Sequence, residues 1–243
     1  MCTQGFESLP TLGIRLRSGR VLEDLEWAGV SPEWFGRSVP WRAFRWHQGQ
    51  RHYSGFYWSS TMHDHVIYES RLELSRLLYA DFDPAVRAIF AQPFLLSAQV
   101  EGRSRRHVPD FLLLTDAVPV VVDVKPARLL GEEKVAFTLG WTRHAVAARG
   151  WGYEVFTEPA VARLENIRFL AGYRRADLID PVVVREVRAA GLAGGTLGQG
   201  FAAVPGHPAA LVRAAVLHLL WRGELTVDLD RPLSRRNVLG GPR

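Results

Sequence analysis

The feature that most constrains the fold is a pair of apolar segments joined by a short turn. Val108–Leu114 is rich in β-branched, aromatic and aliphatic residues, Thr115–Pro119 supplies turn residues, and Val120–Val124 is a second apolar run. This pattern predicts a β-hairpin. The second strand is expected to end before Pro126, because proline cannot donate a hydrogen bond to a β-ladder.

The predicted hairpin carries two carboxylates and a lysine. Asp110 lies on the first strand and Asp123 on the second, and side chains alternate between faces, so Asp123 and Lys125 share one face. Carboxylate oxygens suit Mg²⁺, and a nearby ammonium can position a water against a phosphate. The pattern Pro-Asp…Asp-x-Lys therefore favours a metal-dependent nuclease over a purely structural hairpin.

A further acidic group is expected from the helix that precedes the sheet. The segment Val66–Asp81 has the apolar spacing of a helix and carries Glu69 and Glu73, four residues apart on one face. Each glutamate also has a structural interpretation as a surface ion pair, Glu69 with Arg71 and Glu73 with Arg76. Taken alone, neither glutamate identifies itself as a ligand.

Composition sets broad limits on the chain. Its 243 residues suffice for one large domain or two small ones, and its one cysteine, Cys2, excludes an internal disulfide and suits a reducing cytoplasm. We expect neither a signal peptide nor a membrane span. The net charge of +5 comes mostly from arginine. That bias fits both a GC-rich genome and phosphate contacts, so it permits nucleic-acid binding without showing it.

The remaining periodic segments predict a mixed α/β core followed by a helical region. The core elements expected around the hairpin are the strand Gln92–Val100, the helix Glu132–Arg149 and the strand Trp151–Phe156. A meander, a crossover helix and a final strand give a mixed sheet with helices packed on it. The C-terminal elements resemble a winged-helix domain and are the helices Glu165–Arg175, Pro181–Ala190 and Pro208–Arg222 and the short strand Leu225–Leu229.

The segment Trp41–Trp58 interleaves aromatic residues with arginines and histidines. Aromatics on both sides of the Gln48–Gln50 turn suggest a β-ribbon. The favoured interpretation is a ribbon that packs its aromatics on the main domain. The alternative is an arm that contacts DNA, with arginines on phosphates and aromatics near bases.

Several motifs together resemble the TnsA family, the endonuclease subunits of heteromeric transposases. The resemblance is good over about residues 60–158 and less specific in the C-terminal part, and the Trp41–Trp58 stretch looks like the N-terminal part of actinobacterial members. The motifs are Glu69–Leu74, Asp81–Pro84, Gln92–Phe94, Pro109–Phe111 and Val122–Pro126. The family has a restriction-endonuclease-like PD-(D/E)xK core. The resemblance therefore implies an N-terminal aromatic and basic extension (1–58), a nuclease core (59–160) and a winged-helix-like domain (161–243).

The resemblance also implies a ligand set. Glu73, with Glu69 as the alternative acid, would bind Mg²⁺ together with Asp110, Asp123 and the backbone carbonyl of Val124, and Mn²⁺ could substitute. The metal would polarise the scissile phosphate and lower the pKa of its bound water. Lys125 would hold the attacking water or stabilise the charge that develops on the phosphate.

By the same resemblance, the protein would cut the 5′ ends of a transposable element in double-stranded DNA. A DDE-type transposase and an AAA+ ATPase regulator would be its partners, in a bacterial cytoplasm at the nucleoid. The alternatives are a stand-alone nuclease of defence or repair and a non-catalytic DNA-binding adaptor. The residues expected to contact DNA are Arg42, Arg45, Arg51, Arg105, Arg106 and His107.

Overall fold

The computed structural model describes residues 9–42 and 53–243, which form a mixed α/β protein. The chain divides into two compact units. The N-terminal unit comprises the chain up to Arg76 together with Ala85–Glu158. The C-terminal unit comprises Pro159–Arg243 together with Leu77–Pro84. The predicted domain boundaries after residues 58 and 160 stay predictions, and β1 (Thr11–Leu16) belongs to the same unit as the hairpin.

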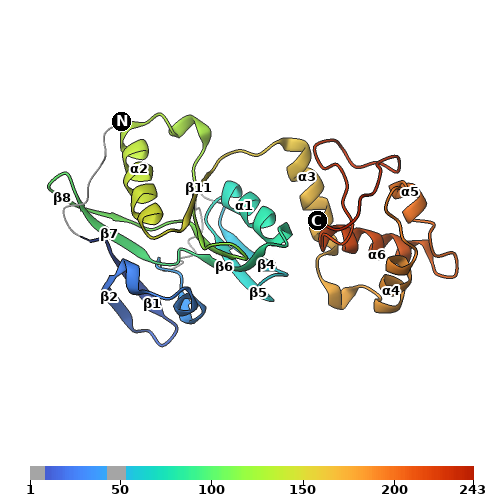
Figure 1. The fold of residues 1–243 in the computed structure, drawn as a ribbon, viewed down its shortest axis with the longest axis horizontal. Coiled ribbons are helices and arrows are strands. Elements are labelled where there is room, and N and C mark those ends of the chain that lie inside the picture. The colour runs from blue at the N-terminus through green and yellow to red at the C-terminus, as the bar shows by residue number, and fades with distance from the viewer. Residues whose placement is uncertain (1–8, 43–52) are drawn as a thin grey trace. The chain divides into compact units, whose positions relative to one another are not determined.

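Strands lie mainly in the N-terminal unit and helices mainly in the C-terminal unit (Figure 1). The remaining strands are β2 (Val21–Glu26), β3 (Ser38–Val39), β4 (Gly55–Ser59), β5 (Asp64–Tyr68), β6 (Val86–Ala91), β7 (Leu95–Val100), β8 (Arg103–His107), β9 (Phe111–Thr115), β10 (Val120–Val124) and β11 (Gly152–Phe156). The α-helices are α1 (Arg71–Phe82), α2 (Glu133–Ala148), α3 (Val161–Leu170), α4 (Pro181–Ala189), α5 (Leu197–Gly200) and α6 (Ala209–Trp221).

The predicted hairpin is the centre of a four-stranded sheet with the order β11-β10-β9-β6. β9 and β10 are antiparallel, with Val122 opposite Phe111. β10 and β11 are parallel, with Asp123 opposite Val155. A parallel pair needs a crossover connection, and α2 supplies it. The predicted hairpin, the crossover helix and the final strand are therefore confirmed.

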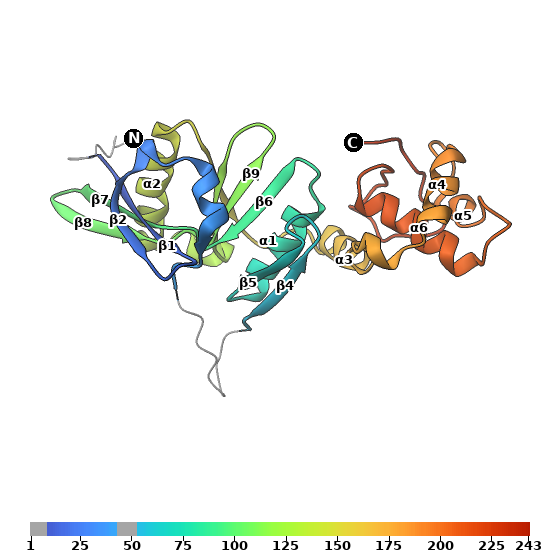
Figure 2. The same cartoon turned by 90° about the horizontal axis from the view of Figure 1, so that it is seen from below.

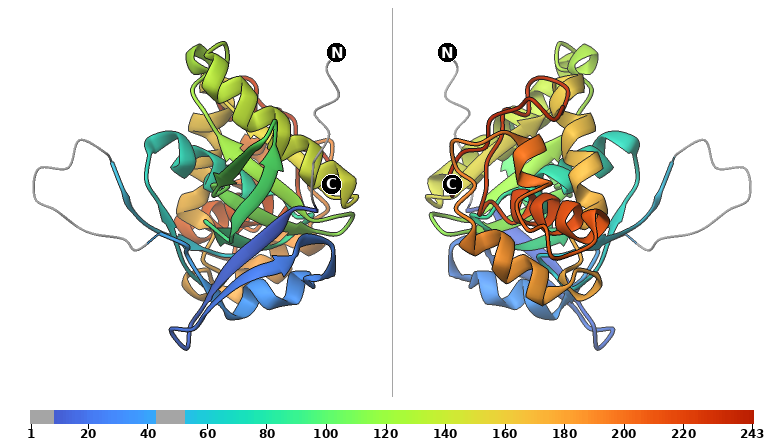
Figure 3. Two further views of the ribbon diagram at one scale, coloured as in Figure 1. Left: turned by 90° about the vertical axis from the view of Figure 1, so that its left-hand side faces the viewer. Right: turned by 90° about the vertical axis from the view of Figure 1, so that its right-hand side faces the viewer.

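A second sheet, β2-β1-β7-β8 with β3 paired to β1, shares its core with the first sheet. Fully buried side chains from both sheets, such as Ile14 and Val121, belong to one apolar cluster. The same cluster contains Trp141 and Ala145 of α2, which crosses the strands in Figure 3. The indole of Trp27 donates a hydrogen bond to the carbonyl of Ala145 over 2.9 Å and joins the N-terminal segment to this helix.

The predicted helix over Val66–Asp81 is wrong in its first part. Residues Val66–Tyr68 belong to β5, which pairs with β4, and the helix begins at Arg71. The run of two β-branched residues and a tyrosine favours a strand. Ser70 then starts the helix, because its hydroxyl accepts a hydrogen bond from the backbone of Glu73 over 3.1 Å.

The predicted strand Gln92–Val100 is confirmed only from Leu95, where β7 begins, and β6 was not predicted. β6 ends at Ala91 and β7 begins at Leu95. Gln92 adopts a left-handed backbone with φ of 45°, and Pro93 has no N–H to donate, so the strand cannot run through this corner. For a similar reason the predicted strand Val108–Leu114 starts later, at Phe111, after Pro109.

The structure describes only part of the predicted ribbon Trp41–Trp58. Residues 43–52 lie outside the part of the chain that the structure describes. Within the described residues, β4 pairs with β5, with Tyr57 opposite Val66, and the pair forms a separate two-stranded sheet (Figure 2). The rings of Tyr53 and Phe56 are more than half exposed.

In the C-terminal unit, the predicted helices Pro181–Ala190 and Pro208–Arg222 are confirmed as α4 and α6. Asp180 caps α4, accepting a hydrogen bond from Val182 N, 2.8 Å away. The helix predicted at Glu165–Arg175 lies earlier, as α3. The predicted strand Leu225–Leu229 is reduced to a single bridge between Thr226 and Gly240, and Thr196 bridges Val238.

α6 is buried on all sides over most of its length. Every residue from Ala215 to Trp221 is buried, so the exposed residues of the helix lie between Ala209 and Arg213. Within the described part of the chain, no helix has both the length and the apolar character that a membrane crossing requires.

The core position of Phe35 supplies a test of how the N-terminal segment is attached. Phe35 is fully buried against Phe94, with ring centroids 5.6 Å apart. We expect Phe35→Ala to lower the free energy of unfolding by about 3–5 kcal/mol through the cavity it leaves. Phe56→Ala, at an exposed ring, should change it by less than about 0.5 kcal/mol. Equal effects in chemical denaturation would contradict the burial of this segment.

Candidate active site

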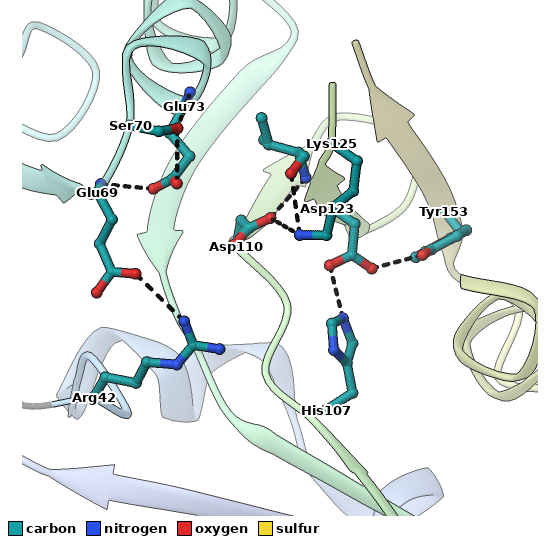
Figure 4. A network of polar contacts seen from close by, with 10 residues as sticks. Arg42, Glu69, Ser70, Glu73, His107, Asp110, Asp123, Lys125 and Tyr153 are labelled. Atoms are coloured by element: carbon teal, nitrogen blue, oxygen red, sulfur yellow. Dashed lines mark hydrogen bonds and ion pairs between the residues drawn. The ribbon is translucent and has the colours of Figure 1, made fainter. Parts of the chain in front are cut away.

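The side chain of Asp110 belongs to a network of polar contacts (Figure 4), and backbone hydrogen bonds hold the residue where the hairpin strands meet β6. Its N–H donates to Val122 O over 3.1 Å, and its carbonyl accepts from Gln92 N over 2.8 Å. Its side-chain Oδ2 accepts from the N–H of Val124 over 2.7 Å. Burial raises the pKa of Asp110, and the nearby Lys125 opposes that rise. The carboxylate is therefore largely buried, with 13% of its side chain exposed, and the backbone fixes its orientation.

Lys125 supplies a positive charge at this point. Its Nζ lies 3.4 Å from Asp110 Oδ2 and donates to Val124 O over 3.1 Å. Its own backbone N–H bonds to Phe156 O over 3.0 Å and continues the β10–β11 ladder by one residue. The ammonium therefore contacts two oxygens that the sequence predicts as metal ligands, one from a carboxylate and one from the backbone.

Asp123 is fully buried, and both its carboxylate oxygens have protein partners. His107 Nε2 lies 2.7 Å from Oδ1, and the hydroxyl of Tyr153 donates to Oδ2 over 2.6 Å. Burial and the Asp123 charge raise the pKa of Tyr153, which keeps this hydroxyl a donor. Each carboxylate oxygen has a second lone pair, so a cation could still bind.

The two partners of Asp123 flank the hairpin in the sequence, His107 before it and Tyr153 after it. His107 ends β8, where its ring lies edge-on to Trp141, and Tyr153 lies on β11 under the guanidinium of Arg143. The sequence did not predict Tyr153 as a site residue. Only the parallel pairing of β10 and β11 brings it close, although the strand that carries it was predictable.

Glu73 lies in the first turn of α1 and has a structural role there. Its carboxylate accepts hydrogen bonds from Glu69 N over 2.8 Å and from the Ser70 hydroxyl over 3.0 Å. This reciprocal pattern is close to a capping box. Burial, with a further contribution from Asp110, raises the pKa of Glu73 to about 7. Glu73 and Asp110 therefore repel each other when both are charged.

Glu69 lies just before α1 rather than on a helical face shared with Glu73. Its carboxylate is 3.3 Å from the guanidinium of Arg42, and both side chains are substantially exposed. The structure thus places Glu73 in electrostatic contact with Asp110 and places Glu69 in an exposed ion pair.

Gln92 is a second residue that the sequence analysis missed. It is buried with a left-handed backbone, a strained conformation for a residue with a side chain. Its side-chain carbonyl accepts from Arg42 N over 3.2 Å, and its backbone carbonyl accepts from Trp41 N over 2.9 Å. Gln92 thereby fixes the segment around residue 42 next to Asp110. Its position directly before a proline was the available signal.

The residues predicted to contact DNA have different surroundings. Arg45 and Arg51 fall outside the described residues. Arg106 is exposed on β8, whereas the guanidinium of Arg105 stacks over Phe137, 4.8 Å from its centroid. Arg42 and His107 are engaged by Glu69 and Asp123 as described above.

The donors of the cluster suit Mg²⁺ in kind, because carboxylate and carbonyl oxygens are its preferred protein ligands. The Lys125 ammonium contacts two of these oxygens. Among the described residues, no trio of His, Cys, Asp or Glu side chains is already arranged as a metal site.

Comparisons with protein-family models and with curated proteins give no match. The resemblance to TnsA therefore stays a prediction from the motifs.

The raised pKa of Glu73 predicts a pH-dependent stability. Because its pKa is about 7 in the folded protein against an ordinary 4.5, its favourable contribution is complete below about pH 4.5 and is lost as the pH rises through 7. Without divalent cations, Glu73→Gln should gain on the order of 1–3 kcal/mol of stability at about pH 8 relative to its effect at about pH 4.

Thermal and chemical unfolding at the two pH values measure this difference. Glu23→Gln removes an exposed negative charge on β2 and serves as the control. A Glu73→Gln effect that does not change with pH would contradict the burial of this carboxyl.

Proposed function

We propose that the N-terminal unit is a metal-dependent DNA endonuclease core of the restriction-endonuclease-like type. The observation that carries this proposal is the cluster at Asp110. There, a buried carboxylate, a backbone carbonyl and the Lys125 ammonium converge next to Glu73. Metal-dependent phosphodiester hydrolysis uses oxygen ligands for a cation. It also uses a positive charge near the phosphate oxygen on which negative charge develops.

The order of elements supports the same proposal. The four-stranded sheet and its helices follow the order α1, β6, β9, β10, α2, β11. This is the helix, three strands, helix and strand of the predicted core, with β6 in the place of the predicted strand Gln92–Val100. β7 and β8 interrupt this order and pair with the N-terminal strands instead. The interruption leads directly into His107 and the Asp110 turn.

In this proposal Asp110, Asp123, Glu73 and the Val124 carbonyl would hold Mg²⁺, or Mn²⁺ in its place. When bound, the metal would supply Lewis-acid activation of the phosphate and a water of lowered pKa. Lys125 would face the phosphate oxygen that gains charge. With a pKa of about 7, Glu73 can hold or release a proton at neutral pH.

The finer assignment is cleavage at the 5′ ends of a transposable element, and only the motif resemblance supports it. We propose double-stranded transposon ends as substrate, a DDE-type transposase and an AAA+ ATPase as partners, and a bacterial cytoplasm as the location. The basic composition, with a net charge of +5, is compatible with a DNA substrate.

We also propose that the C-terminal unit is winged-helix-like. Such a domain combines helices with short β-bridges. This unit has the helices α4, α5 and α6 and the bridges Thr196–Val238 and Thr226–Gly240. α6 is mostly core, so this unit does not present that helix as a reader of the DNA major groove.

Substitutions in the cluster test the nuclease proposal. Asp110→Asn and Lys125→Met should each lower Mg²⁺-dependent cleavage by about 10²-fold or more while the fold is retained. The matched controls are Asp116→Asn, at an exposed aspartate of the same hairpin, and Lys134→Met, at the other lysine of the chain. Full activity of either cluster variant would refute the assigned roles.

The assay should be run on the purified chain alone and together with any DDE-type transposase and AAA+ ATPase that reading frames next to its gene encode. Cleavage that appears only with the partners favours the transposon-end function. Cleavage by the chain alone favours a stand-alone nuclease. DNA binding that is normal in Asp110→Asn, with cleavage absent from the wild type in both settings, favours an adaptor.

Tyr153→Phe tests how Asp123 is held. Removing the hydroxyl leaves one buried Asp123 oxygen without its donor, so we expect a stability loss of about 1–3 kcal/mol. We also expect the Mg²⁺ affinity, measured by calorimetry, to fall about 10–100-fold. Tyr173→Phe in the C-terminal unit is the control. Unchanged metal affinity would show that Asp123 is not a ligand.

A further inference from the structure

A cavity of about 380 Å³ lies on the N-terminal unit outside the proposed nuclease cluster. The β1–β2 hairpin and the 3-10 helix Pro32–Arg37 form its walls, and both lie in the blue part of the ribbon in Figure 2. Its size falls within the range of about 300–1,000 Å³ that is usual for small-ligand sites. The lining residues are Leu16, Arg20, Leu22, Glu33, Trp34 and Arg37.

Three of these side chains, those of Trp34, Arg20 and Arg37, make no ring contact, side-chain hydrogen bond or ion pair with described residues. The indole of Trp34 is 45% exposed and makes no ring contact or hydrogen bond with the residues that the structure describes. Arg20 and Arg37 are exposed, and no described carboxylate lies within ion-pair distance of either guanidinium. Among the exposed arginines that are paired, Arg87 lies 2.5 Å from Asp116.

The backbone holds the two arginines at fixed places on either side of β1. Leu16 N donates to Arg20 O over 2.8 Å, and Arg17 N, the next residue of the chain, donates to Arg37 O over 3.0 Å. The hairpin turn closes at Gly19, whose φ of 85° suits glycine. The cavity is therefore built on a rigid frame before any ligand binds.

The 3-10 helix that carries Trp34 is anchored equally firmly. The neighbouring Phe35 is fully buried in the core, and its carbonyl accepts from the Ser38 hydroxyl over 2.8 Å. Ser31 caps the other end of this helix through Glu33 N. Anchoring on both sides keeps the indole at the cavity instead of allowing it to fold onto the core.

The chemistry of the lining selects a ligand with a flat face and a negative charge. Two guanidiniums against the single carboxylate of Glu33 leave a positive excess, and guanidinium forks match phosphate oxygens. An indole stacks on a nucleobase, and Glu33 could accept from an exocyclic amine. We propose that this cavity binds a nucleotide unit of a single strand, with the base on Trp34 and the phosphate between Arg20 and Arg37.

A single strand fits better than a duplex, because stacked and paired bases do not offer a face to an indole. The proposal does not depend on the nuclease cluster, since none of the lining residues belongs to it. The test is therefore made with the full chain carrying Asp110→Asn and in the presence of EDTA, where cleavage cannot affect the result.

The measurement is the fluorescence anisotropy of a labelled short oligothymidylate, titrated with protein at several salt concentrations. Trp34→Leu should weaken binding about tenfold, and Trp34→Phe should retain most of it. Arg20→Gln combined with Arg37→Gln should lower the slope of log affinity against log salt by about 0.7, because both arginines contact the same phosphate. Arg87→Gln and Phe169→Leu, at exposed positions away from the cavity, should leave affinity and slope unchanged.

Competition separates the two sources of the ligand. If free thymidine monophosphate competes as well per site as the oligonucleotide, the cavity binds a free nucleotide, which preserves the chemistry of the proposal. If only the oligonucleotide competes, the ligand is a strand. The proposal is overturned if wild-type protein binds neither probe, or if folded Trp34→Leu and the double arginine variant bind as the wild type does.

Discussion

The burial of two carboxylates among three strands is the constraint on which the rest of the N-terminal unit depends. Ionised carboxylates are costly to remove from water unless hydrogen bonds and charges compensate them. Asp110 is compensated by the backbone of Val124 and by Lys125, and Asp123 by His107 and Tyr153. These partners come from β8, β10 and β11, so the sheet must assemble correctly before either group is satisfied.

The three acids Asp123, Asp110 and Glu73 are not equally compensated, and the proposed metal site rests on this difference. Asp123 has a partner on each oxygen, whereas Asp110 and Glu73 have raised pKa values because their burial is only partly offset. A bound cation would relieve this repulsion. The contact of the Lys125 ammonium with Asp110 and the Val124 carbonyl indicates where such a cation would be favoured. If the Lys125–Asp110 ion pair had only a structural role, the repulsion between Asp110 and Glu73 would bring no benefit.

Sequence patterns were reliable where one segment determines its own structure. The hairpin strand Val120–Val124 and the helix expected at Glu132–Arg149 were predictable because alternation and helical periodicity are local properties. Prediction failed at Val66–Tyr68 and at Gln92, where the competing signals were strand propensity and a proline corner. At the first place the segment pairs with the neighbouring strand β4, and at the second Pro93 has no N–H to donate. Both signals were local, and the helical spacing of the apolar residues concealed the first of them.

The sequence by itself determined the chemical types at the candidate site: the Pro-Asp and Asp-x-Lys motifs and the candidate glutamates. Only the tertiary structure decided which groups meet. Parallel pairing of β10 with β11 brings Tyr153 to Asp123, and the first turn of α1 brings Glu73 within electrostatic range of Asp110. Burial raises the pKa values of both acids. Burial, and contacts between residues far apart in the chain, arise only when the sheet assembles. The sequence could therefore name the candidate acids but not the shifts of their pKa values.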